Sequence, residues 1–154
     1  MKKNKNKLNG FTLIELIVVV AIIGILTGAV VISLNPSARI AQARDGVRKS
    51  DLHQIQSALE MYRSDQGKYP ASISCGSQFD DGGSPPVVIY MKKIPCDPRN
   101  TGQYVYTYSV SGSGSGYSLY ACLENTGDSQ KDSPNNGAYC TGGSTNWSYT
   151  LQNP

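Results

Sequence analysis

Hydrophobic residues divide the chain into three stretches, and the first of these is almost uninterrupted. From Phe11 to Leu34, 24 residues contain a single charged side chain, Glu15. A helix of this length is about 36 Å long, which is enough to cross a hydrocarbon layer of about 30 Å. The pattern therefore predicts a membrane-spanning helix near the N-terminus.

The charges around this helix predict its orientation. Four lysines precede it, with no acid among them: Lys2, Lys3, Lys5 and Lys7. Lysines of this kind stay in the cytoplasm, so everything after Leu34 is expected to be exported. Basic residues after the span weaken this asymmetry: Arg39, Arg44, Arg48 and Lys49. A cleaved secretory signal with a cleavage site at residues 27–29 is the alternative, but its apolar core would be shorter than this one.

The second stretch, residues 35–66, has the pattern of an amphipathic helix. Its apolar residues recur at steps of three to five, the repeat of one helix face: Ile40, Ala43, Val47, Leu52, Ile55, Leu59 and Tyr62. We expect this stripe to pack on another part of the chain. Gly67, followed by Pro70, is expected to end the helix. Asn35 and Pro36 either begin a separate helix or kink one long helix.

The polar side of the same predicted helix carries closely spaced charges. Asp45 is three residues from Arg48 and four from Lys49. Pairs at this spacing contribute only about 0.2–0.5 kcal/mol within one helix, and the same charges could instead bridge two subunits. His53 lies beside the apolar stripe, and we expect it to be a solvated or interface side chain rather than a ligand.

The third stretch, residues 67–154, is rich in Gly, Ser, Asn, Pro and Tyr, which is typical of short strands separated by loops. Alternation at 104–109 and 117–124, with Ser-Gly repeats between them, predicts a hairpin. Its apolar face needs a cover, and the stripe of residues 35–66 is available. We therefore expect an α+β fold in which a long N-terminal helix packs on a small antiparallel sheet with loops.

Charge and composition exclude several functions. The net charge is +3, and without the four leader lysines the remainder carries −1. Nucleic-acid binding depends on neutralising phosphates, so no nucleic-acid partner is expected. His53 is the single histidine, which excludes a multi-histidine metal site. No nucleophile with a placed base can be identified, so we expect neither an enzyme nor a bound cofactor.

Four cysteines lie on the predicted exported side: Cys75, Cys96, Cys122 and Cys140. An even number in an oxidising compartment predicts disulfides. A zinc site is the alternative, although the chain has no Cys-x-x-Cys pair. We favour pairing Cys75 with Cys96 and Cys122 with Cys140, because each bond closes a loop-rich segment near a predicted strand. Asn146 begins an N-glycosylation pattern, which is common by chance.

The apolar stretch also has two features that a simple anchor does not need. An ionised Glu15 at membrane depth costs about 2.5–3.5 kcal/mol, and the span contains no Lys or Arg. The carboxylate therefore either reaches the membrane edge or pairs with a positive group from outside the span. Cleavage after Gly10 would create such a group, an α-amine at Phe11, one helical turn away. Gly24 and Gly28 are spaced for close helix packing in lipid, although such pairs are common in membrane helices.

The segment Gly10-Phe11-Thr12-Leu13-Ile14-Glu15, between a lysine-rich leader and the apolar run, resembles the N-terminal signature of type IV prepilins and type II secretion pseudopilins. In that family a prepilin peptidase cuts after the glycine, here Gly10, and methylates the next residue, here Phe11. The resemblance implies that Glu15 pairs with the N-terminal amine of a neighbouring subunit. It also implies that the apolar helices bundle in a filament and can unwind between Gly28 and Pro36.

A second, weaker resemblance covers roughly residues 60–124. Residues 66–70, residues 90–98 and the tyrosine-rich strand resemble the major pseudopilin of type II secretion systems. Those proteins usually bind calcium through an acidic C-terminal loop. The implied ligands here are Glu124, Asp128 and Asp132, a partial set, since calcium takes six to eight oxygens. A solvated loop without metal is the favoured alternative.

The resemblance predicts four segments: a leader at 1–10, a membrane and filament-core helix at 11–34, an amphipathic helix at 35–66 and an exported β-rich head at 67–154. We expect a structural pilin or pseudopilin that polymerises with identical subunits. Its expected partners are a prepilin peptidase, an inner-membrane platform and a motor ATPase. It would lie in the cytoplasmic membrane with its N-terminus inside, and then in a periplasmic or cell-surface filament.

Several alternatives remain open at this point. A pilus, a secretion pseudopilus and a competence filament all fit the sequence. The chain could instead be a minor tip subunit or binding module for DNA, a surface or a secreted substrate. A third alternative is an anchored domain that never assembles.

Overall fold

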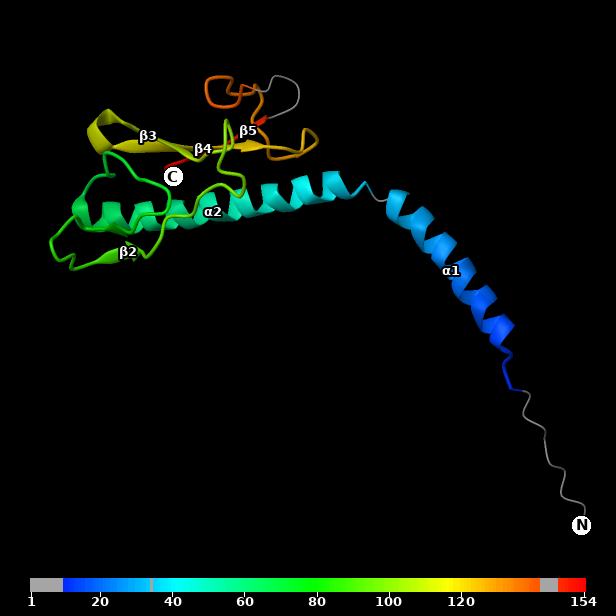
Figure 1. Ribbon diagram of the computed structural model, residues 1–154. Coiled ribbons are helices and arrows are strands. Elements are labelled where there is room, and N and C mark those ends of the chain that lie inside the picture. The colour runs from blue at the N-terminus through cyan, green and yellow to red at the C-terminus, as the bar shows by residue number, and fades with distance from the viewer. Residues whose placement is uncertain (1–9, 34, 142–146) are drawn as a thin grey trace, which may run out of the picture. The chain divides into compact units, whose positions relative to one another are not determined.

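The computed structural model describes residues 10–33, 35–141 and 147–154, and it contains two long helices followed by short strands (Figure 1). The chain divides into two compact units, one ending at Ser37 and the other running from Ala38 to Pro154. We call the second unit, which includes most of the second helix, the head. The leader residues 1–9 and the glycosylation pattern at Asn146 lie outside the described residues.

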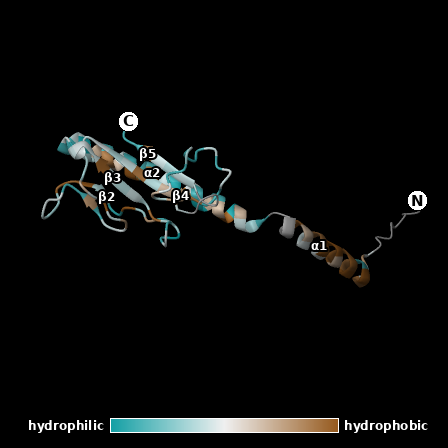
Figure 2. Cartoon of the chain, turned by 90° about the horizontal axis from the view of Figure 1, so that it is seen from above, coloured by the Kyte–Doolittle hydropathy of each residue, from teal (hydrophilic) through white to brown (hydrophobic). Residues whose placement is uncertain are grey.

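The first unit consists mainly of α1, Leu13–Ser33. Its hydropathy is high along most of its length (Figure 2). By length and composition, Leu13–Val30 could cross a membrane, and it is the one helix of this kind in the part of the chain that the structure describes. The helix is continuous through Gly24 and Gly28.

The second helix, α2, spans Pro36–Gln66. Pro36 takes the first helical position, where its missing N–H costs no hydrogen bond, so α2 is a separate helix from α1. Asn35, which precedes it, has a φ of 43°. At the other end Gly67 adopts a φ of 74°, and its N–H donates to the Arg63 carbonyl at 2.8 Å. The predicted end of the helix is therefore confirmed.

The head contains an antiparallel sheet in the order β3-β4-β5, formed by Thr107–Ser111, Gly116–Leu123 and Trp147–Gln152. The predicted hairpin is β3-β4, joined by a short 3-10 turn at Gly112–Gly114. Its first strand begins at Thr107 rather than at Tyr104. The sequence pattern did not identify β5. A small ribbon of β1, Phe79–Asp80, and β2, Ile89–Met91, completes the described strands.

The core lies between α2 and the three-stranded sheet, as Figure 1 shows. Leu119, Ala121 and Leu123 of β4 are at most 1 % exposed, which confirms the predicted apolar face. The helix contributes Leu52, Ile55, Ala58 and Leu59 to the same core. The α+β fold with a long N-terminal helix is confirmed.

One part of the predicted helix stripe is wrong. Leu52, Ile55 and Leu59 are buried, whereas Ile40 is 54 % exposed and Val47 is 48 % exposed. The step of five residues from Val47 to Leu52 turns the helix by about 500°, which places the two residues on different faces. The predicted stripe is thus two faces of α2, and the second half alone covers the sheet.

Both disulfides join the cysteines in the favoured pairing. Cys75 is bonded to Cys96 and Cys122 to Cys140, and no described cysteine is free. The first bond closes the loop between α2 and β3, and the second ties the end of β4 to the segment before β5. The described cysteines therefore stabilise loops and form no zinc site.

Candidate functional site

Glu15 lies in the first turn of α1, where it completes a capping box. Thr12 precedes the helix, and its backbone N–H and its hydroxyl both donate to Glu15 Oε2 at 2.8 Å. In return, the Glu15 backbone N–H donates to the Thr12 hydroxyl oxygen at 3.3 Å. This reciprocal pattern satisfies helix N–H groups that otherwise have no partner. The sequence argument missed this local partner, although the Thr-x-x-Glu spacing was available to identify it.

The expected cleavage point lies immediately before the capping box. Gly10 and Phe11 are exposed and non-helical, and Phe11 is 83 % exposed. The bond between them is therefore in an open segment next to the start of α1. A peptidase can reach such a bond without unwinding the helix.

The rest of α1 presents an apolar surface to its surroundings. The large apolar side chains between Leu13 and Val30 are 44–76 % exposed. A side chain added at Gly24 or Gly28 would meet nothing within 4 Å. The two glycines thus lie on an open helix surface, where they leave room for another helix.

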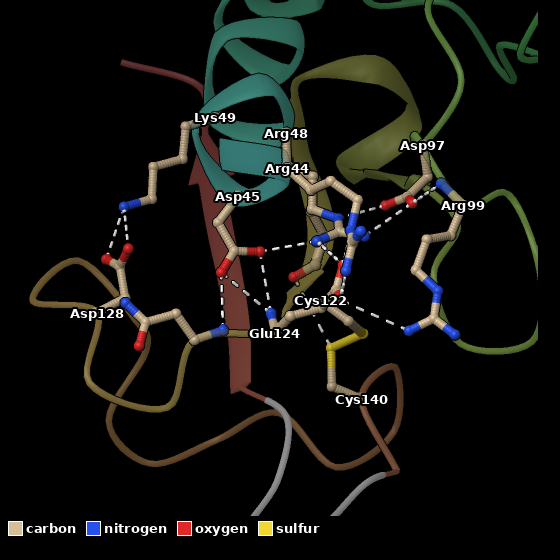
Figure 3. Close-up of polar contacts among 12 residues, drawn as sticks. Arg44, Asp45, Arg48, Lys49, Asp97, Arg99, Cys122, Glu124, Asp128 and Cys140 are labelled. Atoms are coloured by element: carbon tan, nitrogen blue, oxygen red, sulfur yellow. Dashed lines mark hydrogen bonds and ion pairs between the residues drawn. A yellow bond between two sulfur atoms is a disulfide. The ribbon is translucent and has the colours of Figure 1, made fainter. Parts of the chain in front are cut away.

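A second cluster lies in the head, where Arg48 of α2 is completely buried (Figure 3). Its Nε and Nη2 donate to Asp97 at 2.7 and 3.0 Å. Its Nη1 donates to Asp45 at 2.7 Å and to Glu124 at 2.8 Å. We call Arg48, Asp45, Asp97 and Glu124 the Arg48 cluster.

The Arg48 cluster also holds the chain that leaves β4. Asp45 accepts the backbone N–H groups of Glu124 and Asn125 at 2.8–3.1 Å. The Glu124 carboxylate accepts hydrogen bonds from Nε and Nη2 of Arg44, one to each oxygen. Asp45 and Arg48 were expected to form a weak surface pair or to bridge subunits, and their burial within one chain corrects that expectation.

The sequence argument missed Asp97 and Arg44, and it also missed Arg99, which lies 3.6 Å from Glu124. The spacing along α2 could have indicated that Arg48 is buried, because Arg48 is four residues before Leu52 and seven before Ile55. This spacing places Arg48 on the core face of α2. A buried guanidinium needs acidic partners, and these come from segments distant in the sequence.

Burial and charged neighbours shift the pKa values of residues in and near the Arg48 cluster. Hydrogen bonds from Arg44, opposed by burial and reinforced by Arg48, lower the pKa of Glu124 to about 2. Burial alone would lower the pKa of Arg48, but its hydrogen bonds to Asp97 and Glu124 raise it. Burial and a hydrogen bond to Asp51 raise the pKa of Tyr106. These groups are fixed in one charge state at neutral pH, as suits a structural role.

The three residues implied as calcium ligands do not converge on a shared point. Glu124 faces arginines, Asp128 binds the Lys49 ammonium, and Asp132 accepts from the Thr150 hydroxyl and N–H. No group of three or more acidic, histidine or cysteine residues suited to a metal occurs in residues 10–33, 35–141 and 147–154. Each of the three carboxylates thus binds a partner of the same chain and contributes to no shared set of the six to eight oxygens that calcium takes.

His53 lies on the surface of α2 and contacts neutral partners. Its Nδ1 is 3.3 Å from the Gln56 side chain and its Nε2 is 3.3 Å from the Tyr149 hydroxyl. The imidazole therefore links α2 to β5.

Comparison with known proteins matches both halves of the chain. A family model described as a prokaryotic N-terminal methylation motif matches residues 5–31, and a model of type II secretion system protein G matches residues 36–136. No solved structure matches the chain significantly.

Curated relatives named type II secretion system core protein G are similar over most of their length. The Pseudomonas aeruginosa protein is 35 % identical over 120 residues, which cover 73 % of this chain and 81 % of the relative. The Vibrio cholerae protein is 32 % identical over 116 residues, with coverages of 67 % and 74 %. The Escherichia coli protein is 34 % identical over 100 residues, with coverages of 60 % and 68 %. The chain belongs to the type II secretion system protein G family.

Proposed function

We propose that this chain is a membrane-anchored precursor that is cut between Gly10 and Phe11, methylated at Phe11 and then assembled with identical copies into a periplasmic filament. As a member of the protein G family it is a pseudopilin, a structural subunit and not an enzyme. A prepilin peptidase would process it. An inner-membrane platform and its motor ATPase would move it from the membrane into the filament.

The observation that carries this proposal is the position of Glu15 at the start of an apolar helix. Its Oε2 holds both Thr12 donors, and its Oε1 takes part in none of the hydrogen bonds of the described chain. Cleavage would supply an ammonium at Phe11. The Phe11 ammonium of a neighbouring subunit could donate a hydrogen bond to Glu15 Oε1. This ion pair would offset the cost of about 2.5–3.5 kcal/mol of placing a charge in an apolar environment.

Pairing between the amine of one subunit and Glu15 of the next is a head-to-tail contact. Such contacts repeat without closing and so produce a helical filament. Before cleavage no α-amine lies at Phe11, so the contact is unavailable to the precursor. Cleavage and assembly would be coupled in this way.

The head offers a matching surface on the exposed side of α2. We call Ile40, Ala43, Val47, Ser50, Gln54, Ser57 and Met61 the seam. These residues are all exposed and uncharged, and they follow alternating steps of three and four, the repeat of a helix-packing seam. The exposed charged residues of α2, Arg39, Arg63 and Asp65, all lie outside the seam.

The proposed occupant of the seam is α1 of another copy. The seam is about 33 Å long and α1 about 32 Å, at 1.5 Å per residue. Apart from Glu15, α1 carries no charge, so it needs an uncharged surface once it leaves the lipid. Small side chains at Ala43, Ser50 and Ser57 would let the two backbones approach closely.

Replacement of Glu15 tests the assembly step. Glu15→Leu should leave membrane insertion and processing intact, but lower the yield of sheared filaments at least tenfold, a change that corresponds to about 1.4 kcal/mol. Thr27→Val is the control, because it removes a polar group from the same helix. Normal filaments from Glu15→Leu would contradict the proposed pairing.

Replacement of Gly10 tests the cleavage point. In Gly10→Val the precursor should keep residues 1–10, as measured by mass spectrometry of the intact chain. A trimmed Gly10→Val chain would place the cut elsewhere.

Added charge tests the seam. Ser50→Glu with Ser57→Glu should leave the melting temperature of the purified chain unchanged and prevent filament formation. Gln42→Glu, an exposed position on α2 outside the seam, is the matched control. Normal filaments from the double variant would show that the seam faces solvent in the assembly.

A further inference from the structure

Residues 124–141, which follow β4, contain an acidic turn that is held by a side-chain ammonium. Lys49 Nζ lies 2.6 Å from both Asp128 oxygens (Figure 3). It also lies 3.0 Å from Gln130 Oε1. Three side-chain oxygens thus converge on one positive centre. Both charged side chains are mostly covered, with 18 % of the Lys49 and 14 % of the Asp128 side chain exposed.

The backbone of the turn is arranged around the same carboxylate. The Gln130 N–H donates to Asp128 Oδ1 at 2.8 Å, and the Asp128 N–H donates to the Asn125 carbonyl at 3.2 Å. Lys49 also lies 5.7 Å from the centre of the Tyr149 ring on β5. The ammonium therefore connects α2, the turn and the last strand.

The other acidic groups of the segment are also engaged by partners of the same chain. Glu124 is neutralised by Arg44 and Arg48, and Asp132 is held by Thr150 of β5 at 2.6 Å. The Cys122–Cys140 disulfide closes the segment from the other side. Each of these contacts ties the segment to a helix or a strand.

A calcium ion would have to compete with these contacts. Calcium binds oxygens at 2.3–2.6 Å and needs several that are free of other cations. The Lys49 ammonium already lies 2.6 Å from both oxygens of Asp128, and a divalent ion on the same oxygens would repel it strongly. Lys49 and a calcium ion would therefore compete for the same two oxygens.

We propose that the Lys49 ammonium is the resident cation of this turn, so that residues 124–141 are held by an internal ion pair and a disulfide, without calcium. The contacts belong to one chain, so this inference does not depend on filament assembly. It makes the head insensitive to changes in calcium outside the cytoplasm.

Thermal unfolding tests the proposal. It is measured on the full chain in detergent, with no added oxidant or reductant, so that both disulfides stay intact. The melting temperature should be the same within about 1 °C in 5 mM CaCl2 and in 5 mM EGTA. A rise of several degrees with calcium, reversed by EGTA, would overturn it.

Removal of the ammonium tests the positive part of the proposal. Lys49→Met should lower the melting temperature by several degrees and increase hydrogen exchange in residues 124–141. Lys93→Met, a change at an exposed lysine after β2, is the matched control and should do neither. Unchanged exchange in Lys49→Met would refute the role of the ammonium.

A double variant separates the pair from other effects of either side chain. Adding Asp128→Asn to Lys49→Met should lower the melting temperature little further than Lys49→Met alone, because the two residues share one interaction. Additive losses in melting temperature would show that Lys49 and Asp128 stabilise the head independently, contrary to the proposal.

Discussion

Replacing Arg48 by methionine should destabilise the head more than any change to its exposed charges. The Arg48 side chain is completely buried and donates four hydrogen bonds to Asp97, Asp45 and Glu124. Methionine fills a similar space but leaves the buried carboxylates with fewer positive partners. Breaking a buried pair from one side costs about 3–5 kcal/mol.

This cost converts into a large change in melting temperature. For a head of this size, each kcal/mol changes the melting temperature by roughly 3–5 °C, so Arg48→Met should unfold about 9–25 °C lower. Circular dichroism of the full chain in detergent measures the change. Arg48→Lys should recover part of the loss, because an ammonium keeps the charge but lacks the planar fork that binds Asp97 through two nitrogens.

Arg99→Met is the control for this prediction. The Arg99 side chain is 44 % exposed and lies 3.6 Å from Glu124, so its loss should cost less than about 1 kcal/mol. If Arg48→Met melts within 3 °C of Arg99→Met, the Arg48 cluster does not stabilise the fold as argued.

Three further predictions concern the head. The pKa of Glu124 is lowered to about 2 from an ordinary 4.5, so its contribution to the free energy of unfolding is complete above pH 4.5 and is lost as the pH falls toward 2. Urea unfolding should show a loss of up to about 3 kcal/mol over this range. Glu124→Gln should make the free energy of unfolding less dependent on pH. Replacing Cys122 and Cys140 by alanine should cost about 3 kcal/mol, because their bond closes a loop over 18 positions; a loss below 1 kcal/mol would contradict the loop-closure argument. Leu59→Ala should cost about 2–5 kcal/mol, whereas Met61→Ala, on the exposed face of α2, should change the stability of the monomer by less than about 0.5 kcal/mol; equal losses would contradict the assignment of the two faces.

Several features of this protein follow from short-range patterns in the sequence. The apolar run from Phe11 to Leu34 sets α1, because a spanning helix needs only length and hydrophobicity. Gly67 ends α2, since it can adopt a positive φ without strain. The alternation in residues 117–124 predicts β4 and its buried face. The junction at Gly10, Phe11 and Glu15 indicates the family before any fold is known.

Other features depended on contacts between distant parts of the chain. Val47 and Leu52 both look like core residues, and the shape of the sheet decided which of them is covered. The strand β5 has a mixed burial pattern, and its pairing with β4 places it in the sheet. Local periodicity describes what a segment can bury, and it contains no information about what covers it.

The charges show this difference most clearly. Within α2, Asp45 and Arg48 form an ordinary pair three residues apart, which by itself is worth a few tenths of a kcal/mol. Their burial comes from Asp97 and Glu124, which lie 49 and 76 positions from Arg48. In the same way Lys49 meets Asp128 across 79 positions. The sequence alone determined the apolar helix and the family, and it predicts the cleavage junction, because all of these depend on neighbouring residues. Tertiary structure alone decided which charges are buried, because a salt bridge between distant residues leaves no local pattern.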